Sequence, residues 1–186
     1  MNNPLIDTFP DRLVARGPHP SLGAHAETYG RLIGSWTGEV SVHPPDAPTV
    51  TTSAEIHFAW VLDGRAVQDV WITPALADRA ARPAATPELY GTRLYGTTLR
   101  VFDPRRESWR VVWWDPPSGE RAELEGRRVG AGGDIVQFGT RDGWPIRWTF
   151  SEIRADSFLW QGHILEPAGS QWRLQGEFRM RRINPR

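Results

Sequence analysis

The sequence contains no cysteine, and this absence removes several kinds of chemistry at once. Disulfide bonds, thiolate metal sites and cysteine nucleophiles are all excluded. A surplus of charge of one sign is missing too, since 22 Lys and Arg residues balance 22 Asp and Glu residues. A chain without net charge has no general electrostatic attraction to nucleic acid or to an anionic membrane, so we expect neither partner.

Long apolar runs are also absent. No stretch approaches the roughly 20 apolar residues that a membrane-spanning helix needs. Near the N-terminus, Asp7, Pro10 and Asp11 stand where a signal peptide carries its apolar stretch. We therefore expect a cytoplasmic protein, and its 186 residues are enough for a single domain, 1–186, with a sizeable core.

Several motifs that would indicate a particular chemistry are missing. The sequence has no His-Glu-x-x-His, no histidine pair with metal-ligand spacing and no Gly-x-Ser-x-Gly elbow. The glycine cluster from Gly130 to Gly133 joins two predicted strands and precedes no helix, which predicts a turn and not a phosphate-binding loop. From the residues alone we therefore expect no metal and no cofactor.

Tryptophan is abundant, with 10 residues, and 18 glycines and 16 prolines supply many turn signals. Short runs of apolar and aromatic residues lie between these signals, a pattern typical of an all-β sandwich or barrel. About ten antiparallel strands in chain order can close into a barrel and so remove their edges. We predict an all-β, antiparallel up-and-down barrel with strands at 34–43, 50–61, 65–73, 93–102, 108–115, 119–129, 133–139, 144–154, 157–166 and 170–182.

Three segments of the single domain lie outside these strands. Repeated prolines predict an irregular arm at 1–20. A short helix is predicted at 21–33, with Ser21 as its cap and one apolar face at helical spacing. The barrel follows at 34–182, and its one long connection, 74–92, is interpreted either as a flap over the barrel mouth or as a solvated loop.

Alternation along the strands predicts which side chains point into the barrel. Where apolar residues alternate with polar or charged ones, the apolar set is assigned to the interior. In 93–102 we expect Arg100 to face the solvent, which turns Tyr95, Thr97, Leu99 and Val101 inward. The other residues predicted to point inward are Trp36, Gly38, Val40, Ile56, Phe58, Trp60, Trp109, Val111, Trp113, Trp144, Ile146, Trp148, Phe150, Trp172, Leu174, Gly176, Phe178 and Met180.

These assignments predict an interior lined by aromatic rings, with few polar groups, which is how small-molecule pockets are generally built. We expect the barrel to bind a small apolar or aromatic molecule that stacks on tryptophan. The residues predicted to contact this ligand are Trp60, Trp71, Tyr95, Trp109, Trp113, Trp148, Trp160 and Phe178. The alternative is a barrel filled by its own tryptophan side chains, which holds no ligand.

Two strands, 65–73 and 157–166, carry apolar residues on both faces, so alternation cannot choose the face that points inward. A strand of this kind needs apolar cover outside the barrel as well as inside. Trp114, which directly follows the inward-facing Trp113, needs the same cover. We therefore predict a homodimer that forms partly through this outer surface.

Three residues are candidates for catalysis. Asp69 and His163, if both face the interior, form an acid–base pair in an apolar pocket, and Tyr95 can orient a ligand there. The alternative function is therefore a cofactor-free enzyme that catalyses an isomerisation, dehydration or cyclisation. The competing interpretation of Asp69 is an ion pair with Arg65 on the outer wall of the barrel.

Most of the chain, from about Gly34 to Arg182, resembles a known kind of barrel. The resemblance rests on GSWTGEV, with Gly-x-Trp at the start of the first strand, on YGTTLRVFDPRRESWRVVWWDP, and on IRWTFSEIRADSFLW with the later WRLQGEF. These stretches are similar to an uncharacterised group of bacterial calycin-like domains of unknown function, allied to lipocalins, fatty-acid-binding proteins and nitrobindins. The resemblance implies a β-barrel with a pocket and with Trp36 across its closed end. The likeness to nitrobindin also implies haem as a further alternative ligand, bound through His163.

Overall fold

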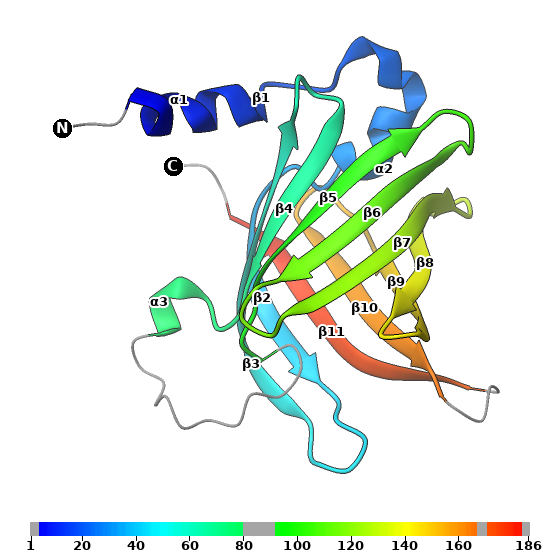
Figure 1. The fold of residues 1–186 in the computed structure, drawn as a ribbon. Helices are drawn as coiled ribbons and strands as arrows, with labels where there is room; N and C mark the ends of the chain where they lie inside the picture. The colour runs from blue at the N-terminus through cyan, green and yellow to red at the C-terminus, as the bar shows by residue number, and fades with distance from the viewer. Residues whose placement is uncertain (1–3, 80–91, 167–170, 184–186) are drawn as a thin grey trace.

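The computed structural model describes residues 4–79, 92–166 and 171–183 of the chain. Ten antiparallel strands, β2 to β11, pair in chain order, and β2 pairs with β11 to close the barrel (Figure 1). This confirms the predicted all-β up-and-down barrel. The strands, whose ends lie close to the predicted ones, are β2 (Gly34–Val42), β3 (Val50–Val61), β4 (Ala66–Ile72), β5 (Tyr95–Asp103), β6 (Ser108–Asp115), β7 (Glu120–Val129), β8 (Asp134–Arg141), β9 (Trp144–Ser151), β10 (Ser157–Leu165) and β11 (Trp172–Arg182).

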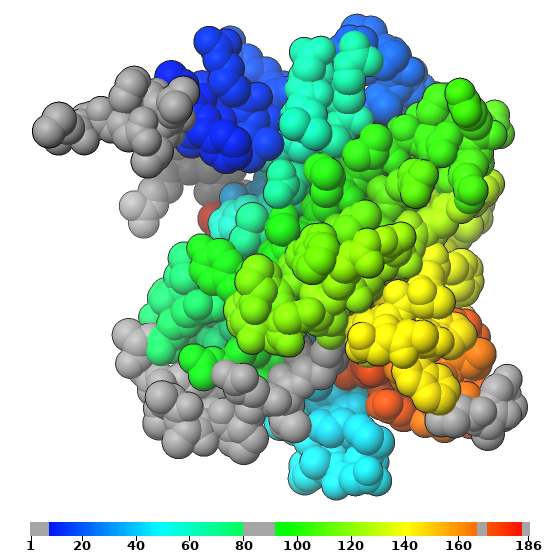
Figure 2. Space-filling view, viewed as in Figure 1, coloured from blue at the N-terminus to red at the C-terminus, as the bar shows by residue number. Residues whose placement is uncertain are grey.

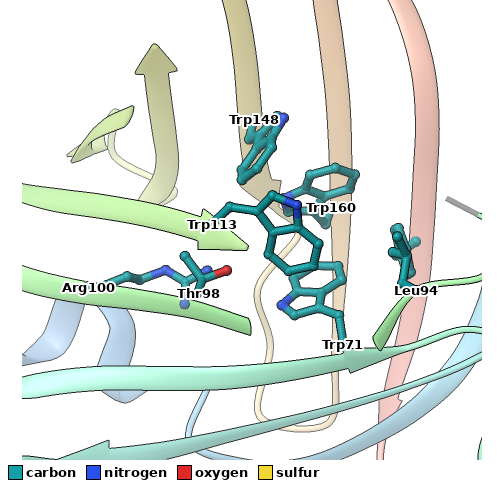
Figure 3. A pocket seen from close by; sticks show the side chains of 8 residues that line it. Trp71, Leu94, Thr98, Arg100, Trp113, Trp148 and Trp160 are labelled. Carbon is teal, nitrogen blue, oxygen red and sulfur yellow. The ribbon is translucent and has the colours of Figure 1, made fainter. Parts of the chain in front are cut away.

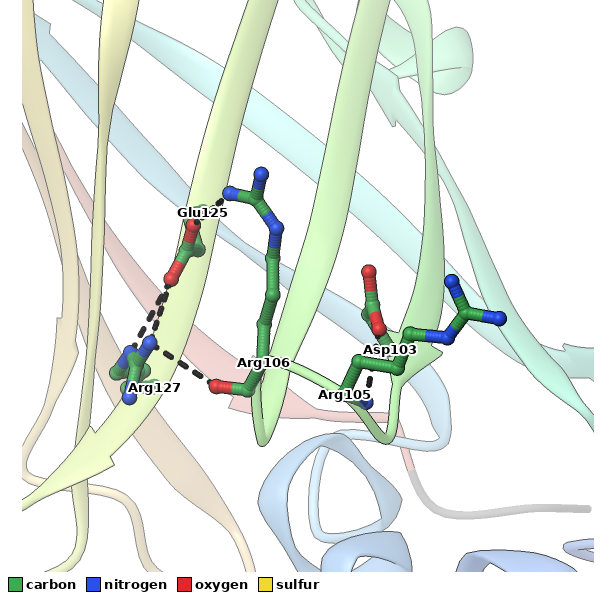
Figure 4. Close-up of polar contacts among 5 residues, drawn as sticks. All are labelled: Asp103, Arg105, Arg106, Glu125 and Arg127. Carbon is green, nitrogen blue, oxygen red and sulfur yellow. Dashed lines mark hydrogen bonds and ion pairs between the residues drawn. The ribbon is translucent and has the colours of Figure 1, made fainter.

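The hairpin between β5 and β6 illustrates how local chemistry ends the strands. Asp103 accepts two hydrogen bonds in the turn, one from Arg105 N to its side chain (3.0 Å) and one from Arg106 N to its backbone oxygen (3.2 Å). On the neighbouring strand, Glu125 pairs with the guanidinium groups of Arg106 and Arg127 (Figure 4). The Asp-Pro turn predicted from the sequence therefore forms, and it fixes the register of the two strands.

The chain before the barrel is more regular than the arm predicted at 1–20. It forms helix α1 (Pro4–Leu13) and strand β1 (Val14–Ala15), which pairs with β3. The prediction of an irregular arm was wrong because proline is tolerated where a helix begins, as Pro4 is here, so that Pro10 alone interrupts the hydrogen bonding of α1.

The helix predicted at 21–33 is shorter than expected and is divided in two. A 3-10 helix, η1 (Pro20–Ala26), is followed by a single α-helical turn, α2 (Glu27–Gly30). The division lies at Gly23, whose φ of 50° is outside the helical region and is accessible to glycine at little cost.

Helix α2 and the start of β2 close one end of the barrel. Trp36 is fully buried there and donates its indole N–H to the backbone oxygen of Leu32 at 2.7 Å. The guanidinium of Arg182 lies 4.0 Å from the centre of the Trp36 ring. Arg182 also donates hydrogen bonds to the backbone oxygens of Arg31, Ile33 and Ala155. The implied position of Trp36 across the closed end is thereby confirmed, and we call the opposite end, where 73–94 joins β4 to β5, the open end.

Most of the predicted inward-facing residues are buried, and the two ambiguous strands are now assigned. Strand β4 turns Val67, Asp69 and Trp71 inward, and strand β10 turns Phe158 and Trp160 inward. Except for Asp69, which is buried but polar, these side chains belong to one hydrophobic core. Its other members include Trp109, Val111, Trp113, Ile146, Trp148, Phe150, Phe178 and Met180.

Strand β5 has the opposite orientation to the one predicted. Thr98 and Arg100 are buried in the interior, whereas Tyr95 is 46% exposed and Val101 is also exposed. The prediction was wrong because it assumed that an arginine must face the solvent. A buried charge is acceptable when an opposite charge meets it, and Asp69 on β4 supplies that charge.

Strand β11 follows the predicted alternation only in its second half. Gly162 on β10 pairs with Gly176, but the next residue, His163, pairs with Leu174, so one extra residue, Gln175, forms a β-bulge. The bulge reverses the faces of the strand. Trp172, which we predicted to point inward, lies on the outer surface, where the guanidinium of Arg147 stacks 4.9 Å from its ring.

The predicted flap, 74–92, lies mostly outside the described residues. Its described part includes a short helix, α3 (Leu76–Arg79), at the open end.

On the viewed face, strands β5 to β7 form a continuous wall beside the N-terminal segment (Figure 2). Across 4–79, 92–166 and 171–183, no helix is both long and apolar enough to cross a membrane.

Candidate functional site

The open half of the barrel contains a small cavity whose wall is mainly tryptophan (Figure 3). Its volume is about 30 Å³, and a water molecule needs roughly 10–15 Å³ measured in this way. The cavity therefore has room for about two or three water molecules as it stands. The residues that line it are Trp71, Leu94, Thr98, Arg100, Trp113, Trp148, Trp160 and Phe178.

The aromatic rings of this wall pack against one another edge to face. The ring centre of Trp71 lies 5.3 Å from that of Trp160 and 4.8 Å from that of Phe178. Trp148 is in turn 5.6 Å from Trp160 and 6.2 Å from Trp113. Edge-to-face pairs of this kind add about 0.5–1.5 kcal/mol each beyond their buried area, so the wall is a connected set of rings.

Two glycines make room for the tryptophan rings. A Cβ atom at Gly96 would lie 2.3 Å from Cη2 of Trp113, and one at Gly162 would lie 2.6 Å from Cη2 of Trp160. Both distances are shorter than van der Waals contact, so any larger residue at either glycine has to move a ring. From the sequence, glycine was interpreted mainly as a turn signal, so this role was not predicted.

The cavity ends at a buried ion pair between neighbouring strands. Asp69 Oδ2 accepts a hydrogen bond from Arg100 Nη1 at 2.5 Å, and Asp69 Oδ1 accepts one from the backbone N–H of Thr98 at 2.7 Å. The side chains of Asp69 and Arg100 are 0% and 1% exposed. Their charges cancel, so this floor of the cavity is polar but has no net charge.

Aromatic groups from the closed half surround the other side of Arg100. Its guanidinium carbon lies 5.0 Å from the ring centre of Tyr29, 5.6 Å from that of Phe58 and 5.8 Å from that of Phe150. Burial raises the pKa of Tyr29 above its ordinary value of 10.0, although the charge of Arg100 acts in the opposite direction. Tyr29 therefore remains a neutral phenol.

Three donors in the cavity wall have no hydrogen-bond partner among the described residues. They are the indole N–H groups of Trp71 and Trp148 and the Nε–H of Arg100, and all three nitrogen atoms are buried. Indole and guanidinium N–H groups can donate but not accept. The wall therefore combines apolar rings with an excess of donors.

A second polar group lies at the open end of the barrel, on strands β7, β8 and β11. Arg141 donates a hydrogen bond to the side chain of Gln175 at 2.6 Å and lies 3.5 Å from the carboxylate of Glu120. Burial raises the pKa of Glu120 above its ordinary value of 4.5, which the charge of Arg141 partly offsets. This group was not predicted, because the bulge that turns Gln175 inward leaves no mark on the alternation.

The structure places the predicted ligand-binding residues in two groups. Trp71, Trp113, Trp148, Trp160 and Phe178 line the cavity. The other three do not: Trp60 packs near Gly30, the ring of Trp109 contacts Tyr29, and Tyr95 is exposed under the guanidinium of Arg79. Arg100, Thr98 and Leu94 line the cavity instead, and sequence reasoning missed them.

The three candidate catalytic residues are not brought together. Asp69 is inside, Tyr95 is on the outer surface, and His163 pairs with Arg147 on the outer face of β9 and β10. Burial and then the charge of Arg147 lower the pKa of His163. Asp69 could have revealed Arg100, because a buried carboxylate needs a cation and Arg100 lies on the adjacent strand.

The outward position of His163 also bears on haem. Haem ligation in the barrel needs an axial side chain that points inward, and none of the described residues that line the cavity is a histidine. Within the described parts of the chain, no group of three or more His, Cys, Asp or Glu residues could hold a metal ion. The described residues that line the cavity therefore do not fit haem.

No protein-family model matches the chain, and no curated protein matches its sequence. The fold is similar to that of an S-type phycobiliprotein lyase, CPES, from Guillardia theta, with a TM-score of 0.57 and 14% identity, covering 86% of this chain and 92% of that chain. It is also similar to Rv2717c from M. tuberculosis, with a TM-score of 0.59 and 13% identity, covering 90% of this chain and 99% of that chain. Both are calycin-like barrels, so these likenesses agree with the predicted type of barrel, and at such low identity they show the fold alone.

Proposed function

We propose that the open half of the barrel binds one small, largely apolar or aromatic molecule. The observation that supports this most is the cavity itself, in which four tryptophans and one phenylalanine surround a buried polar floor. A few polar groups in an otherwise apolar concave wall are typical of small-molecule sites. The similarity in fold to a phycobiliprotein lyase supports the general class of small-molecule barrels and adds no ligand identity.

A ligand larger than water has to displace aromatic rings, because the free volume is only about 30 Å³. Trp71, which contacts Trp113, Trp160 and Phe178, lies among the rings that have to separate. Contacts between rings would then be replaced by contacts between rings and ligand, which are of similar strength. The competing view, a barrel that is filled by its own side chains and holds nothing, predicts that no such exchange occurs.

Binding alone is proposed, and not catalysis. The acid–base enzyme expected from the sequence required Asp69, His163 and Tyr95 in one pocket, and only Asp69 lies inside the barrel. The carboxylate of Asp69 is moreover held by Arg100 and by the backbone of Thr98. A carboxylate engaged in this way is a weak candidate for a general base.

Quenching of tryptophan fluorescence by aminoanthracene tests the proposal, because a ligand among the rings accepts their excitation energy. Saturable quenching is expected for the natural sequence, and Trp160→Phe should reduce its amplitude. Trp114→Phe is the matched control, since Trp114 lies outside the barrel and is 49% exposed. Absence of saturable quenching by aminoanthracene and by other apolar aromatic probes would contradict binding and favour the filled barrel.

The homodimer stays a prediction, and we propose the outer face of β5 and β6 as part of its interface. Tyr95, Val101 and Trp114 are large apolar residues exposed on these two strands. Exposed apolar groups that gather on one surface often mark contacts between proteins. Sedimentation velocity at micromolar concentration should give a dimer that Trp114→Glu dissociates, whereas a monomer in the natural sequence would exclude this interface.

A further inference from the structure

The cavity wall is unusual in the balance of its hydrogen-bonding groups. Trp71 and Trp148 each carry an indole N–H that has no partner among the described residues, and the Nε–H of Arg100 likewise has none. All three residues line the cavity, and all three nitrogen atoms are buried. A buried donor without a partner is costly, so the site favours a molecule that supplies an acceptor.

The charge of the site sets a second condition. Among the described residues that line the cavity, Arg100 alone is charged, and Asp69 already neutralises it at 2.5 Å. A carboxylate that entered this end of the cavity would lose its hydration and find no uncompensated positive charge there. At the open end, Arg141 lies 3.5 Å from the carboxylate of Glu120, and Asp115 adds a second nearby carboxylate, so no uncompensated positive charge is found among the described residues there either.

The shape and chemistry of the wall set a third condition. Apart from Thr98 and Arg100, the lining residues are apolar, and most are aromatic. An aromatic ligand stacks well on such rings, whereas a flexible polar molecule would leave their faces unmatched. Thr98, beside Arg100 in Figure 3, adds a hydroxyl that can donate a further hydrogen bond.

We infer that the ligand of this barrel is an uncharged aromatic carbonyl compound, whose oxygen accepts one or two hydrogen bonds from the unpartnered donors of Trp71, Trp148 and Arg100. This inference rests on the proposed function, because it specifies the ligand of the same site. It excludes aromatic carboxylates as the preferred ligands, since Asp69 already neutralises Arg100. It also excludes pure hydrocarbons, which would leave all three donors without a partner.

Three probes of nearly equal shape separate these classes by isothermal calorimetry at neutral pH. Acetylnaphthalene is an uncharged acceptor, isopropylnaphthalene has no acceptor, and naphthoate is an anion, all substituted at the same ring position. Acetylnaphthalene should bind at least about tenfold more tightly than isopropylnaphthalene, which corresponds to one or two net hydrogen bonds. Naphthoate should bind more weakly than either.

Two tryptophan variants test whether the indole donors carry the preference. Trp148→Phe keeps an aromatic ring but removes one donor, so it should reduce the ratio of affinities for acetylnaphthalene and isopropylnaphthalene several-fold. Trp109→Phe is the matched control, because the indole nitrogen of Trp109 is also buried with no partner in the described parts of the chain, but Trp109 does not line the cavity. The control should leave the ratio unchanged, and an equal loss in both variants would contradict the assignment.

A change of charge tests the second condition. Asp69→Asn leaves the positive charge of Arg100 unpaired, so the relative affinity for naphthoate should rise at least about tenfold, in line with a charge-assisted bond. If this variant does not fold, the three-probe comparison with the natural sequence still decides the matter.

Tightest binding of naphthoate, or equal binding of the ketone and the hydrocarbon, would overturn the inference but leave the proposed function intact. No binding of any of the three, together with no quenching by aminoanthracene, would instead reject the proposed function.

Discussion

The buried pair of Asp69 and Arg100 allows a sharp prediction about stability. Asp69→Asn keeps the shape of the side chain and the acceptor for the N–H of Thr98, but it leaves the charge of Arg100 buried at 1% exposure. Breaking a buried ion pair from one side costs about 3–5 kcal/mol. For a domain of this size, 1 kcal/mol lowers Tm by about 2–4 °C, so the variant should melt about 6–20 °C below the natural sequence.

Urea denaturation followed by far-ultraviolet circular dichroism measures this loss and supports a double-mutant cycle. Asp69→Asn combined with Arg100→Met removes both charges, and the aromatic rings around Arg100 accept an apolar side chain, so most of the lost stability should return. Glu123→Gln is the control, because it breaks the exposed pair with Arg121 and should cost less than about 1 kcal/mol. An equally small cost for Asp69→Asn would show that the variant does not leave the charge of Arg100 buried and unpaired, and would refute the reasoning.

Three further predictions follow from other parts of the barrel. Gly162→Ala should push the ring of Trp160 into the cavity, lower the affinity for acetylnaphthalene at least tenfold in calorimetry and cost about 1–3 kcal/mol of stability through overpacking. Arg182→Ala removes three hydrogen bonds to backbone oxygens at the closed end, so urea denaturation should show a loss of about 2–4 kcal/mol, and an unchanged midpoint would contradict the role of Arg182. Because the pKa of Glu120 is raised on folding, the folded protein holds this proton more tightly than the unfolded chain, and stability should fall as pH rises from 4.5 through the folded-state pKa. Glu120→Gln should remove that part of the pH dependence in urea denaturation, and an identical dependence in both proteins would refute the assignment.

The strands were predictable because their signals are local. The turn at Asp103 depends on one side-chain and one backbone bond, to the N–H groups of Arg105 and Arg106. The Asp142–Gly143 turn has φ values of 52° and 81° that suit these residue types. Alternation then gave the inward face wherever one face was clearly polar, as it is around Ile146 and Trp148. Turn chemistry and the alternation of side chains along each strand were therefore enough to predict the barrel.

The candidate site was only partly predictable because its decisive features are not local. The orientation of β5 depends on the ion pair between Arg100 and Asp69. Asp69 lies 31 positions earlier in the chain, so no property of β5 alone reveals this pair. The outward position of Trp172 depends on a single extra residue, Gln175, in the pairing of β10 and β11. The aromatic wall was found from the sequence, but the polar floor required the register of neighbouring strands.

The polar floor raises the question of why a barrel interior retains an ion pair at all. Replacing a buried pair with apolar residues is often neutral or stabilising, so stability alone does not explain why Asp69 and Arg100 are buried here. If the double variant of Asp69→Asn and Arg100→Met is as stable as the natural sequence but no longer prefers acetylnaphthalene to isopropylnaphthalene, the pair serves ligand recognition. If the double variant keeps both its stability and that preference, the indole donors of Trp71 and Trp148 are sufficient, and the pair acts only by excluding anions. Loss of stability without any change in preference would assign the pair to the fold alone.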